Sequence, residues 1–273
     1  MKYRQWQPPA QLKNYIRYFW VIESDAGEPV PKTYRPIADG CPGLIFQPSE
    51  TDALHDDVKQ KLPGLFLYGQ TVQPRTLYTK GGLLLTGVCF YPHALKSVFG
   101  LPAAELTDTC IDLGLTFNKH NKHLTEQLIC TPSFDGQFDL LSSYLSKLIQ
   151  INNADSDKPT HYALGQIIQA NGNIELKQLL KEINMTERTF ERKFNHHVGI
   201  SPKLFARICR FQTSLQQLKS SNYNKLSDIA FDNGYADQSH FIRAFKEFAG
   251  YSPNQLNKQK STGVENLLEW KND

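Results

Sequence analysis

Two arginines, Arg192 and Arg243, occupy the same place in two copies of one short motif, and an arginine side chain can bond two acceptors at once. Residues 190–202 read FERKFNHHVGISP and residues 241–253 read FIRAFKEFAGYSP, with six identities in thirteen positions and no gap. In each copy the arginine lies two residues from phenylalanines that are four apart. At 3.6 residues per turn, the phenylalanines share one helix face and the arginine points away from it. The motif therefore predicts a helix with an aromatic buried face and an exposed cationic face suited to a polyanion.

Each copy of the motif follows a second, shorter amphipathic segment. The apolar positions of these segments are Leu176, Leu179, Leu180 and Ile183 in the first copy, and Leu226, Ile229, Ala230 and Phe231 in the second. Asn184-Met185 and Gly234-Tyr235 are typical of tight turns, and Thr186 and Asp237 suit the N-cap of the next helix. A short helix, a tight turn and a second helix make a helix-turn-helix unit, whose second helix enters the major groove of duplex DNA.

The stretch between the two units predicts one long helix. Leu204, Ile208, Phe211, Leu215 and Leu218 alternate at spacings of four and three, which is a continuous apolar stripe. Such a helix packs against both units and fixes their separation. This matters because successive major grooves on one side of B-form DNA lie about 34 Å apart.

The exposed positions of the two second helices are the candidate DNA contacts: Arg188, Glu191, Arg192, Gln238, Ser239, His240 and Arg243. Each arginine can contact guanine or phosphate, and Glu191 can accept from cytosine N4 or pair with Arg188. Other basic residues are candidates for phosphate contact, although a solvated face explains each of them equally well: Lys193, Lys203, Arg207, Arg210 and Lys246. The phenylalanines are expected in the core, because helical spacing disfavours a stacking platform for single-stranded bases.

The charge of the chain is concentrated in one part of it. Residues 159–260 carry 14 basic and 8 acidic side chains, whereas residues 1–158 carry 15 and 16. This asymmetry is typical of a polyanion-binding module beside a neutral one. We therefore predict a near-neutral first domain over 1–152, a linker at 153–158, a DNA-binding domain over 159–260 and a tail at 261–273.

The first half of the chain predicts a β-rich fold with some helix. Short runs of β-branched and aromatic residues predict strands at 18–23, 43–47, 64–68, 76–80 and 83–91. Apolar residues at helical spacing predict helices at 93–99 and 134–151. Repeated short strands favour a barrel or a sandwich. Six residues could line a ligand cavity, although core packing explains most of them as well, so no effector-binding residue is assigned: Trp20, Tyr34, Arg35, Phe46, Phe90 and Tyr91.

The titratable residues do not assemble into a recognisable catalytic or metal site. Five dispersed cysteines argue against a disulfide framework or zinc site and are expected to be small buried residues in a reducing compartment. His120 and His123, and the adjacent His196 and His197, lack a second set of ligands, so neither a metal nor another cofactor is predicted. A β-barrel enzyme tethered to DNA would need a nucleophile or an acid pair in the first half, and none is recognisable, so no enzymatic activity is expected.

The second half resembles the DNA-binding domain of AraC/XylS-type bacterial transcription regulators. The resemblance covers residues 164–256 and rests on Asp228-Ile-Ala230, Gly234-Tyr235, residues 237–246 and Gly250-Tyr-Ser-Pro253. It implies seven helices in two subdomains, with recognition helices at 187–196 and 238–248. The segments 34–46, 87–92 and 99–107 are similar to the sensor region of one branch of these regulators. That similarity implies a cupin-like β-barrel with dimerising helices, and so an α+β chain with an all-α DNA-binding domain.

The resemblance also implies partners. It suggests a dimeric transcription activator that binds double-stranded DNA, contacts RNA polymerase and responds to a small molecule through its first domain. A first domain that only dimerises is an open alternative. The sequence shows no signal peptide and no apolar run long enough for a membrane helix, so we expect a cytoplasmic protein.

Overall fold

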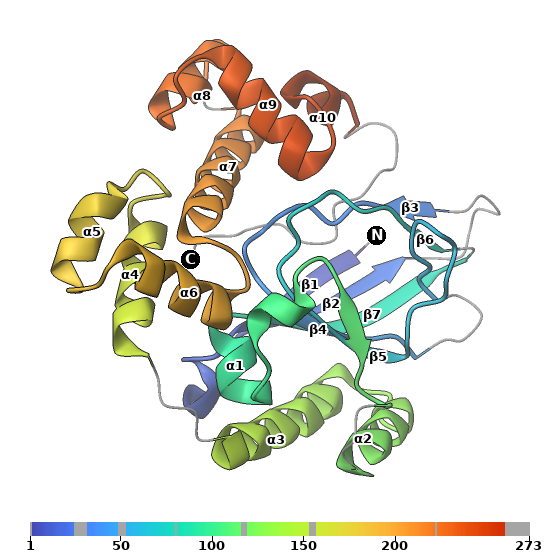
Figure 1. The fold of residues 1–273 in the computed structure, drawn as a ribbon. Helices are drawn as coiled ribbons and strands as arrows, with labels where there is room; N and C mark the ends of the chain where they lie inside the picture. The colour runs from blue at the N-terminus through green and yellow to red at the C-terminus, as the bar shows by residue number, and fades with distance from the viewer. Residues whose placement is uncertain are drawn as a thin grey trace.

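A computed structural model describes residues 2–24, 32–48, 53–79, 81–115, 119–152, 157–221 and 223–259 of the chain. It contains a β-sheet domain with three helices, followed by a helical domain (Figure 1). The expected linker at 153–158 lies largely outside the described residues, and the tail at 261–273 lies wholly outside them. Within the described part, the helices are too short or too polar to cross a membrane.

Six antiparallel strands form the main sheet in the order β1-β2-β7-β4-β5-β8. Their bounds are β1 Lys2–Trp6, β2 Ile16–Ser24, β4 Gly43–Phe46, β5 Leu65–Tyr68, β7 Leu83–Phe90 and β8 Cys110–Asp112. A two-stranded ribbon pairs β3 (Lys32–Tyr34) with β6 (Leu77–Thr79). The five predicted strands are present within a few residues. The pattern missed β1, β3 and β8, which are short or polar.

The expected closure of the sheet into a barrel is wrong. Among the described strands, β1 pairs only with β2 and β8 pairs only with β5, so the sheet is open at both edges. Closure is unnecessary for burial because other elements cover both faces. The first domain is therefore a covered, open sheet.

Side chains alternate along the strands between the two faces of the sheet. On β2, Phe19 and Val21 pack into one core with the helices α1 (Ala94–Phe99), α2 (Lys119–Ile129) and α3 (Phe134–Asn152). Tyr18, Trp20 and Ile22 face the other core, which is closed by loops and the β3-β6 ribbon. Figure 1 shows α1 to α3 along one side of the sheet. Two buried faces explain why the β2 and β7 sequences are nearly continuous apolar runs.

The described part of the second half contains the seven helices that the resemblance implies. They are α4 Lys158–Gln169, α5 Leu176–Glu182, α6 Glu187–Val198, α7 Pro202–Ser220, α8 Leu226–Asp232, α9 Gln238–Ala249 and α10 Pro253–Gln259. The recognition helices α6 and α9 begin at the predicted residues. The predicted long helix is α7, which runs from the first unit to the second (Figure 1).

The helix ends follow from local chemistry. The side chains of Thr186 and Asp237 accept hydrogen bonds from Thr189 N and His240 N, and so cap α6 and α9 as predicted. Ser201 caps α7 in the same way. Both predicted turns have a residue with positive φ, Asn184 at 51° and Gly234 at 69°, the conformation that asparagine and glycine adopt most readily.

The two domains share a packed interface that reaches both helix-turn-helix units. On the first unit, Thr107 Oγ1 donates a 2.7 Å hydrogen bond to Gly199 O at the end of α6. On the second, Ala38 N donates to Phe248 O at 3.2 Å. Ala38 lies in the hydrophobic core of the helical domain, and its carbonyl also accepts from Gln212 of α7. The first domain therefore contacts both units.

Candidate nucleic-acid interface

Each recognition helix buries one aromatic face. Phe190 and Phe194 of α6 are 2% and 0% exposed, and Phe241, Phe245 and Phe248 of α9 are all at 0%. Phe194 packs on the following helix, with its ring 5.8 Å from that of Phe205, while Phe245 packs 5.0 Å from Phe211 of the same α7. The expectation that these phenylalanines are core residues is confirmed. The packing fixes which face of α6 and α9 turns outward.

The opposite faces carry the predicted contact residues. Arg188, Glu191 and Arg192 are exposed on α6, and Gln238, Ser239 and Arg243 are exposed on α9, whereas His240 is half-buried. Arg188 and Glu191 form no ion pair with any residue that the structure describes. The possibility that Glu191 pairs with Arg188 is therefore not realised, and both side chains are available to a ligand.

A groove of about 680 Å³ opens between the two units. Its floor is α7, which contributes Lys203, Arg207 and Arg210. Glu187, the first residue of α6, and His240, in the first turn of α9, lie on its walls. The N-terminal ends of both recognition helices thus meet one groove with a basic floor, and the N-terminal residues of such helices are the ones that contact base edges.

The five phosphate candidates have different surroundings. Lys203 and Lys246 are exposed on α7 and α9. Arg207 forms an ion pair with Glu247 and lies over the Phe248 ring at 5.3 Å. This pairing links α7 to α9 and reduces the positive charge that Arg207 presents.

Arg210 bonds to the protein itself. Its guanidinium donates to Gly172 O and to Gly234 O, both at 3.2 Å, and lies 5.8 Å from the Tyr235 ring. Gly172 precedes the first unit's α5, and Gly234 lies in the turn of the second unit. Arg210 therefore links the two units through their backbones.

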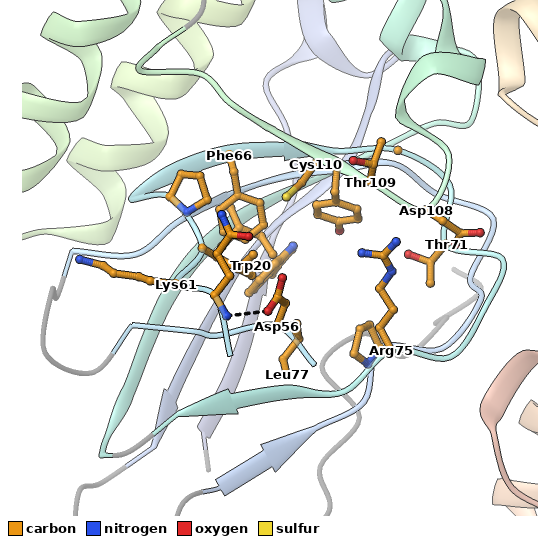
Figure 2. Close-up of a pocket in the computed structure, with 17 residues that line it drawn as sticks. Trp20, Asp56, Lys61, Phe66, Thr71, Arg75, Leu77, Asp108, Thr109 and Cys110 are labelled. Carbon is orange, nitrogen blue, oxygen red and sulfur yellow. Dashed lines mark hydrogen bonds between the residues drawn. The ribbon is translucent and has the colours of Figure 1, made fainter. Parts of the chain in front are cut away.

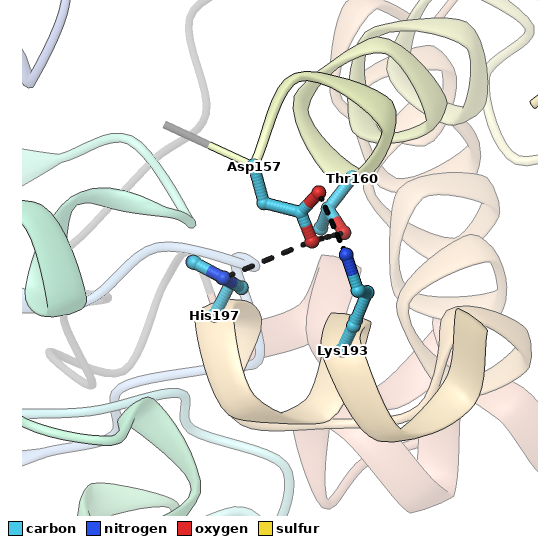
Figure 3. Close-up of polar contacts among 4 residues, drawn as sticks. All are labelled: Asp157, Thr160, Lys193 and His197. Atoms are coloured by element: carbon cyan, nitrogen blue, oxygen red, sulfur yellow. Dashed lines mark hydrogen bonds and ion pairs between the residues drawn. The ribbon is translucent and has the colours of Figure 1, made fainter. Parts of the chain in front are cut away.

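Lys193 is also engaged within the protein, in a polar cluster around Asp157 (Figure 3). Asp157 Oδ1 lies 3.3 Å from Lys193 Nζ, and Asp157 Oδ2 accepts a 2.8 Å hydrogen bond from Thr160. His197 Nε2 lies 3.9 Å from the same carboxylate, but burial lowers the pKa of His197, which keeps the ring neutral near pH 7. The cluster attaches the start of α4 to α6.

The six residues suggested to line a ligand cavity in the first domain do not lie around one cavity. Trp20 lines a cavity on the loop side of the sheet, while Phe46 and Phe90 are buried in the core on the helix side. Tyr34 is buried in the loop-side core, Tyr91 is half-buried, and Arg35 lies 4.5 Å over the Tyr251 ring at the domain interface. Other residues that the sequence did not single out also line this cavity, among them Tyr68 and Arg75 (Figure 2). The alternation of side chains along β5 was the only sequence signal that Tyr68 faces the cavity, and no local sequence signal indicated that Arg75 does.

The cysteines are not uniformly buried as expected. Cys41, Cys89 and Cys209 are buried, but Cys110 is half-buried and Cys130 is exposed. Cys130 follows α2, where the helix ends at the surface. No group of three or more potential metal ligands occurs among the described residues. His123 contacts Glu126, one turn along α2, and the side chain of His120 lies outside the described residues.

Comparisons with known proteins match the two halves to separate families. Residues 179–259 match the family model described as a helix-turn-helix domain, and residues 4–112 match a domain of unknown function. An uncharacterised HTH-type transcriptional regulator of Haemophilus influenzae is 35% identical over 106 residues, which cover 38% of this chain and 35% of that protein. The HTH-type transcriptional activator RhaS of Escherichia fergusonii is 27% identical over 29% of this chain and 28% of its own length.

Matches that cover more of the chain have lower sequence identity. The thermoregulatory protein LcrF of Yersinia pestis is 26% identical over 140 residues, which cover 50% of this chain and 49% of LcrF. The crystal structure of ToxT from Vibrio cholerae aligns over 87% of this chain and 97% of that chain, with a TM-score of 0.47 and 14% identity. In these sequence matches the chain spans about half or less of the curated relatives' length.

Proposed function

Because the chain belongs to the AraC/XylS type of helix-turn-helix regulators, we propose that it regulates transcription by laying α6 and α9 into successive major grooves of duplex DNA. The observation that carries this proposal is the pair of buried aromatic faces. They leave Arg188, Arg192 and Arg243 exposed. Glu187 and His240, from the first turns of the same two helices, line one groove with Lys203, Arg207 and Arg210. The matched relatives are regulators and not enzymes, so the comparisons give the tethered enzyme no support.

The exposed residues at the start of each recognition helix are proposed to contact bases. Fewer basic residues than the five sequence candidates are proposed to bind phosphate. Lys203 and Lys246 are exposed, and Arg207 lines the groove despite its pairing with Glu247. Lys193 and Arg210 already have partners within the protein and are assigned a structural role. The proposed interface is therefore narrower than the basic residues of the sequence suggested.

The first domain is proposed to control how the two units are presented. It contacts the end of α6 through Thr107 and the end of α9 through Ala38, so its own conformation bears on their relative orientation. A small molecule that binds two arrangements of this interface with different affinities would shift the population that fits DNA. We further propose that the chain forms a homodimer in the cytoplasm and activates transcription by recruiting RNA polymerase; activation is the role of the matched RhaS, a transcriptional activator.

Selection of bound sequences from random duplex DNA tests the proposed interface. The full chain is expected to enrich two sequence blocks about ten base pairs apart. Arg192→Ala should blur only one block and Arg243→Ala only the other, each at a cost of about 1–3 kcal/mol for the preferred base. Lys147→Ala is the control, because this exposed lysine lies on α3, at the opposite end of the molecule from α9 in Figure 1.

The outcomes of the selection separate the possible roles. Uniform weakening without loss of base preference would assign both arginines to phosphate. No enrichment by the wild-type chain would overturn sequence-specific binding. Thermal shift with metabolites distinguishes a sensing first domain from one that only dimerises, because a ligand of the folded state raises its melting temperature.

A further inference from the structure

Two cysteines that are distant in the sequence lie against each other on the loop side of the sheet. Cys89 is on β7, directly opposite Gly43 of β4, and Cys41 lies two residues before the start of β4. Both side chains are fully buried in the same hydrophobic core, and the Cys89 thiol is hydrogen-bonded to Cys41. The two sulfur atoms are therefore close enough to react with each other.

An arginine stabilises the thiolate form of one of these cysteines. Arg17 Nη1, on β2, donates a 3.2 Å hydrogen bond to Cys41 Sγ. The hydrogen bond from Cys89 lowers the pKa of Cys41, and burial opposes this effect. The charge of Arg17 lowers the same pKa further and outweighs the opposite effect of Asp39. Burial raises the pKa of Cys89 well above its usual range. The pair thus combines one nucleophilic sulfur with one protonated thiol.

A third cysteine of the same region behaves differently. Cys209 on α7 is 6% exposed, and burial raises its pKa to about 12. A thiol with such a pKa stays protonated at neutral pH and reacts slowly. The pKa of Cys41 is lowered although its side chain is more deeply buried, at 0% exposure. The hydrogen-bond partners of Cys41, and not its burial, therefore determine its reactivity.

The burial of the pair limits which oxidant can reach it. Cys41 and Cys89 are both inaccessible to bulky thiol reagents. Arg17 is only half-buried, so solvent comes within one side chain of the Cys41 sulfur. Hydrogen peroxide is little larger than water, and a thiolate beside a cation is the form of cysteine that it oxidises. The surroundings of Cys41 therefore favour this oxidant.

We propose that Cys41 and Cys89 are a modification site at which hydrogen peroxide produces a disulfide bond. The Cys41 thiolate attacks one oxygen of the peroxide, so that an S–O bond forms, the O–O bond breaks and hydroxide leaves. The Cys89 sulfur then attacks the Cys41 sulfur, the S–O bond breaks, and the hydroxyl leaves with the Cys89 proton as water. The hydroxide takes up the proton that Cys41 released. The two sulfurs lose two electrons, which the peroxide gains as it becomes water.

The disulfide would move the backbone that precedes β4. Phe90 N donates to Pro42 O at 3.0 Å, so the pairing of β7 with β4 continues one residue beyond the strand. Cys41 and Cys89 therefore lie near diagonal positions, whose Cα atoms are about 7–8 Å apart. Cα atoms joined by a disulfide lie about 4.4–6.8 Å apart, so the bond draws the segment that carries Cys41 toward β7.

That segment also forms part of the interface between the domains. Ala38, three residues before Cys41, donates to Phe248 O at the end of α9 at 3.2 Å. The Ala38 carbonyl accepts from Gln212 of α7. A disulfide at Cys41 therefore acts on the contact with the second helix-turn-helix unit. Formation of the bond stands by itself, whereas its effect on DNA rests on the proposed function.

Peptide mapping after mild oxidation of the full chain tests the disulfide. The reduced protein is treated with hydrogen peroxide, the remaining thiols are alkylated in denaturant, and tryptic peptides are identified by mass spectrometry. Cys41 and Cys89 lie in separate tryptic peptides, so the bond joins two peptides that dithiothreitol releases. We expect this linked pair as the main product. Oxidation of the exposed Cys130 while the pair stays reduced, or a link from Cys41 to Cys209, overturns the proposal.

Variants separate the roles of the side chains. Cys89→Ser should stop at the sulfenic acid of Cys41, which dimedone labels, and absence of the label in this variant refutes attack by Cys41. Arg17→Gln should slow oxidation about three- to tenfold, because the thiolate fraction falls and a higher nucleophilicity offsets only part of the loss. Arg17→Lys keeps the charge and should stay near the wild-type rate.

The matched control is Cys130→Ser, at an exposed cysteine outside the pair, and it should oxidise at the wild-type rate. Melting temperatures identify the variants that fold. A wild-type rate in folded Arg17→Gln refutes the role of the arginine. If that variant does not fold, a loss of the linked peptides in folded Arg17→Lys refutes it instead.

A DNA titration separates the disulfide from its effect on DNA binding. Fluorescence anisotropy with the selected duplex compares the reduced, oxidised and re-reduced chain. Oxidation should change the affinity about 2- to 10-fold, the equivalent of one hydrogen bond such as that from Ala38 to Phe248, and reduction should restore it. Cys89→Ser should show no such change. A disulfide that forms without any change would support the site and overturn its link to DNA. DNA binding that is intact in a chain that forms no disulfide would overturn the site alone.

Discussion

Arg210 offers the sharpest distinction between a residue that binds DNA and one that holds the DNA-binding domain together. Its guanidinium donates to Gly172 O before the first unit and to Gly234 O within the second, and its stem lies on the long helix between them. Replacement with methionine keeps much of the stem and removes both donors. We expect Arg210→Met to destabilise the protein and to loosen the two units relative to each other.

The magnitude follows from the two hydrogen bonds. A hydrogen bond from a charged donor contributes about 1.5–3 kcal/mol, and the 3.2 Å lengths and partial exposure of this pair place each at or below the low end. The expected loss is about 2–3 kcal/mol in total. For a chain of this size it corresponds to a fall of roughly 4–12 °C in melting temperature.

The assay measures unfolding and DNA binding in the same variants. Binding of the selected duplex is followed at several salt concentrations, because each phosphate contact adds about 0.9 to the slope of log affinity against log salt. Arg210→Met should lower the melting temperature and leave that slope unchanged. Lys203→Met is the matched control on the same helix, and it should lower the slope by about 0.9 without changing the melting temperature.

Opposite behaviour of the two variants would overturn both assigned roles. A slope reduced by about one in Arg210→Met, with an unchanged melting temperature, would make Arg210 a phosphate ligand and the two carbonyl contacts incidental. An unchanged slope in Lys203→Met would remove that lysine from the proposed interface.

Three further predictions concern the first domain and its contacts. Gly87→Ala should lower the free energy of unfolding by about 1–3 kcal/mol in denaturant titrations, because the added Cβ meets the Trp20 ring; wild-type stability would show that the ring moves at no cost. Burial, and then the neighbouring His161, lower the pKa of His93 to about 4, so its contribution to stability is complete above pH 6.5 and is lost as pH falls toward 4. Between pH 7 and pH 5, the free energy of unfolding of His93→Phe should therefore fall by roughly 2 kcal/mol less than that of the wild type. A pH profile identical to that of the wild type would contradict this. In the folded protein a maleimide should label Cys130 first, as mass spectrometry of the peptides can show, and equally fast labelling of a buried cysteine such as Cys89 would argue against this core.

The paired helix-turn-helix units could be predicted from the sequence because their determinants are local. Three local features determine these helices and turns: phenylalanines four residues apart, an N-cap such as Thr186, and a turn with positive φ at Gly234. Each depends only on residues a few positions away. The direction of Arg192 and Arg243 then follows from helical geometry alone. The same logic found β2, β4, β5, β6, β7 and the long α7. It failed for β1, whose polar sequence forms a strand only because β2 offers an edge to pair with.

Tertiary structure decided what the remaining residues do. The sheet remains open because helices and loops cover its faces, which a strand pattern does not encode. Arg210 and Lys193 have the same charge as the exposed basic residues, and only folding brings a carbonyl or a carboxylate to them. Trp20 is far from Tyr68 and Arg75 in the chain, yet all three line one cavity. Local spacing sets the conformation of a segment and the face it exposes, whereas the partners of a side chain depend on contacts between distant segments, and these exist only once the chain is packed.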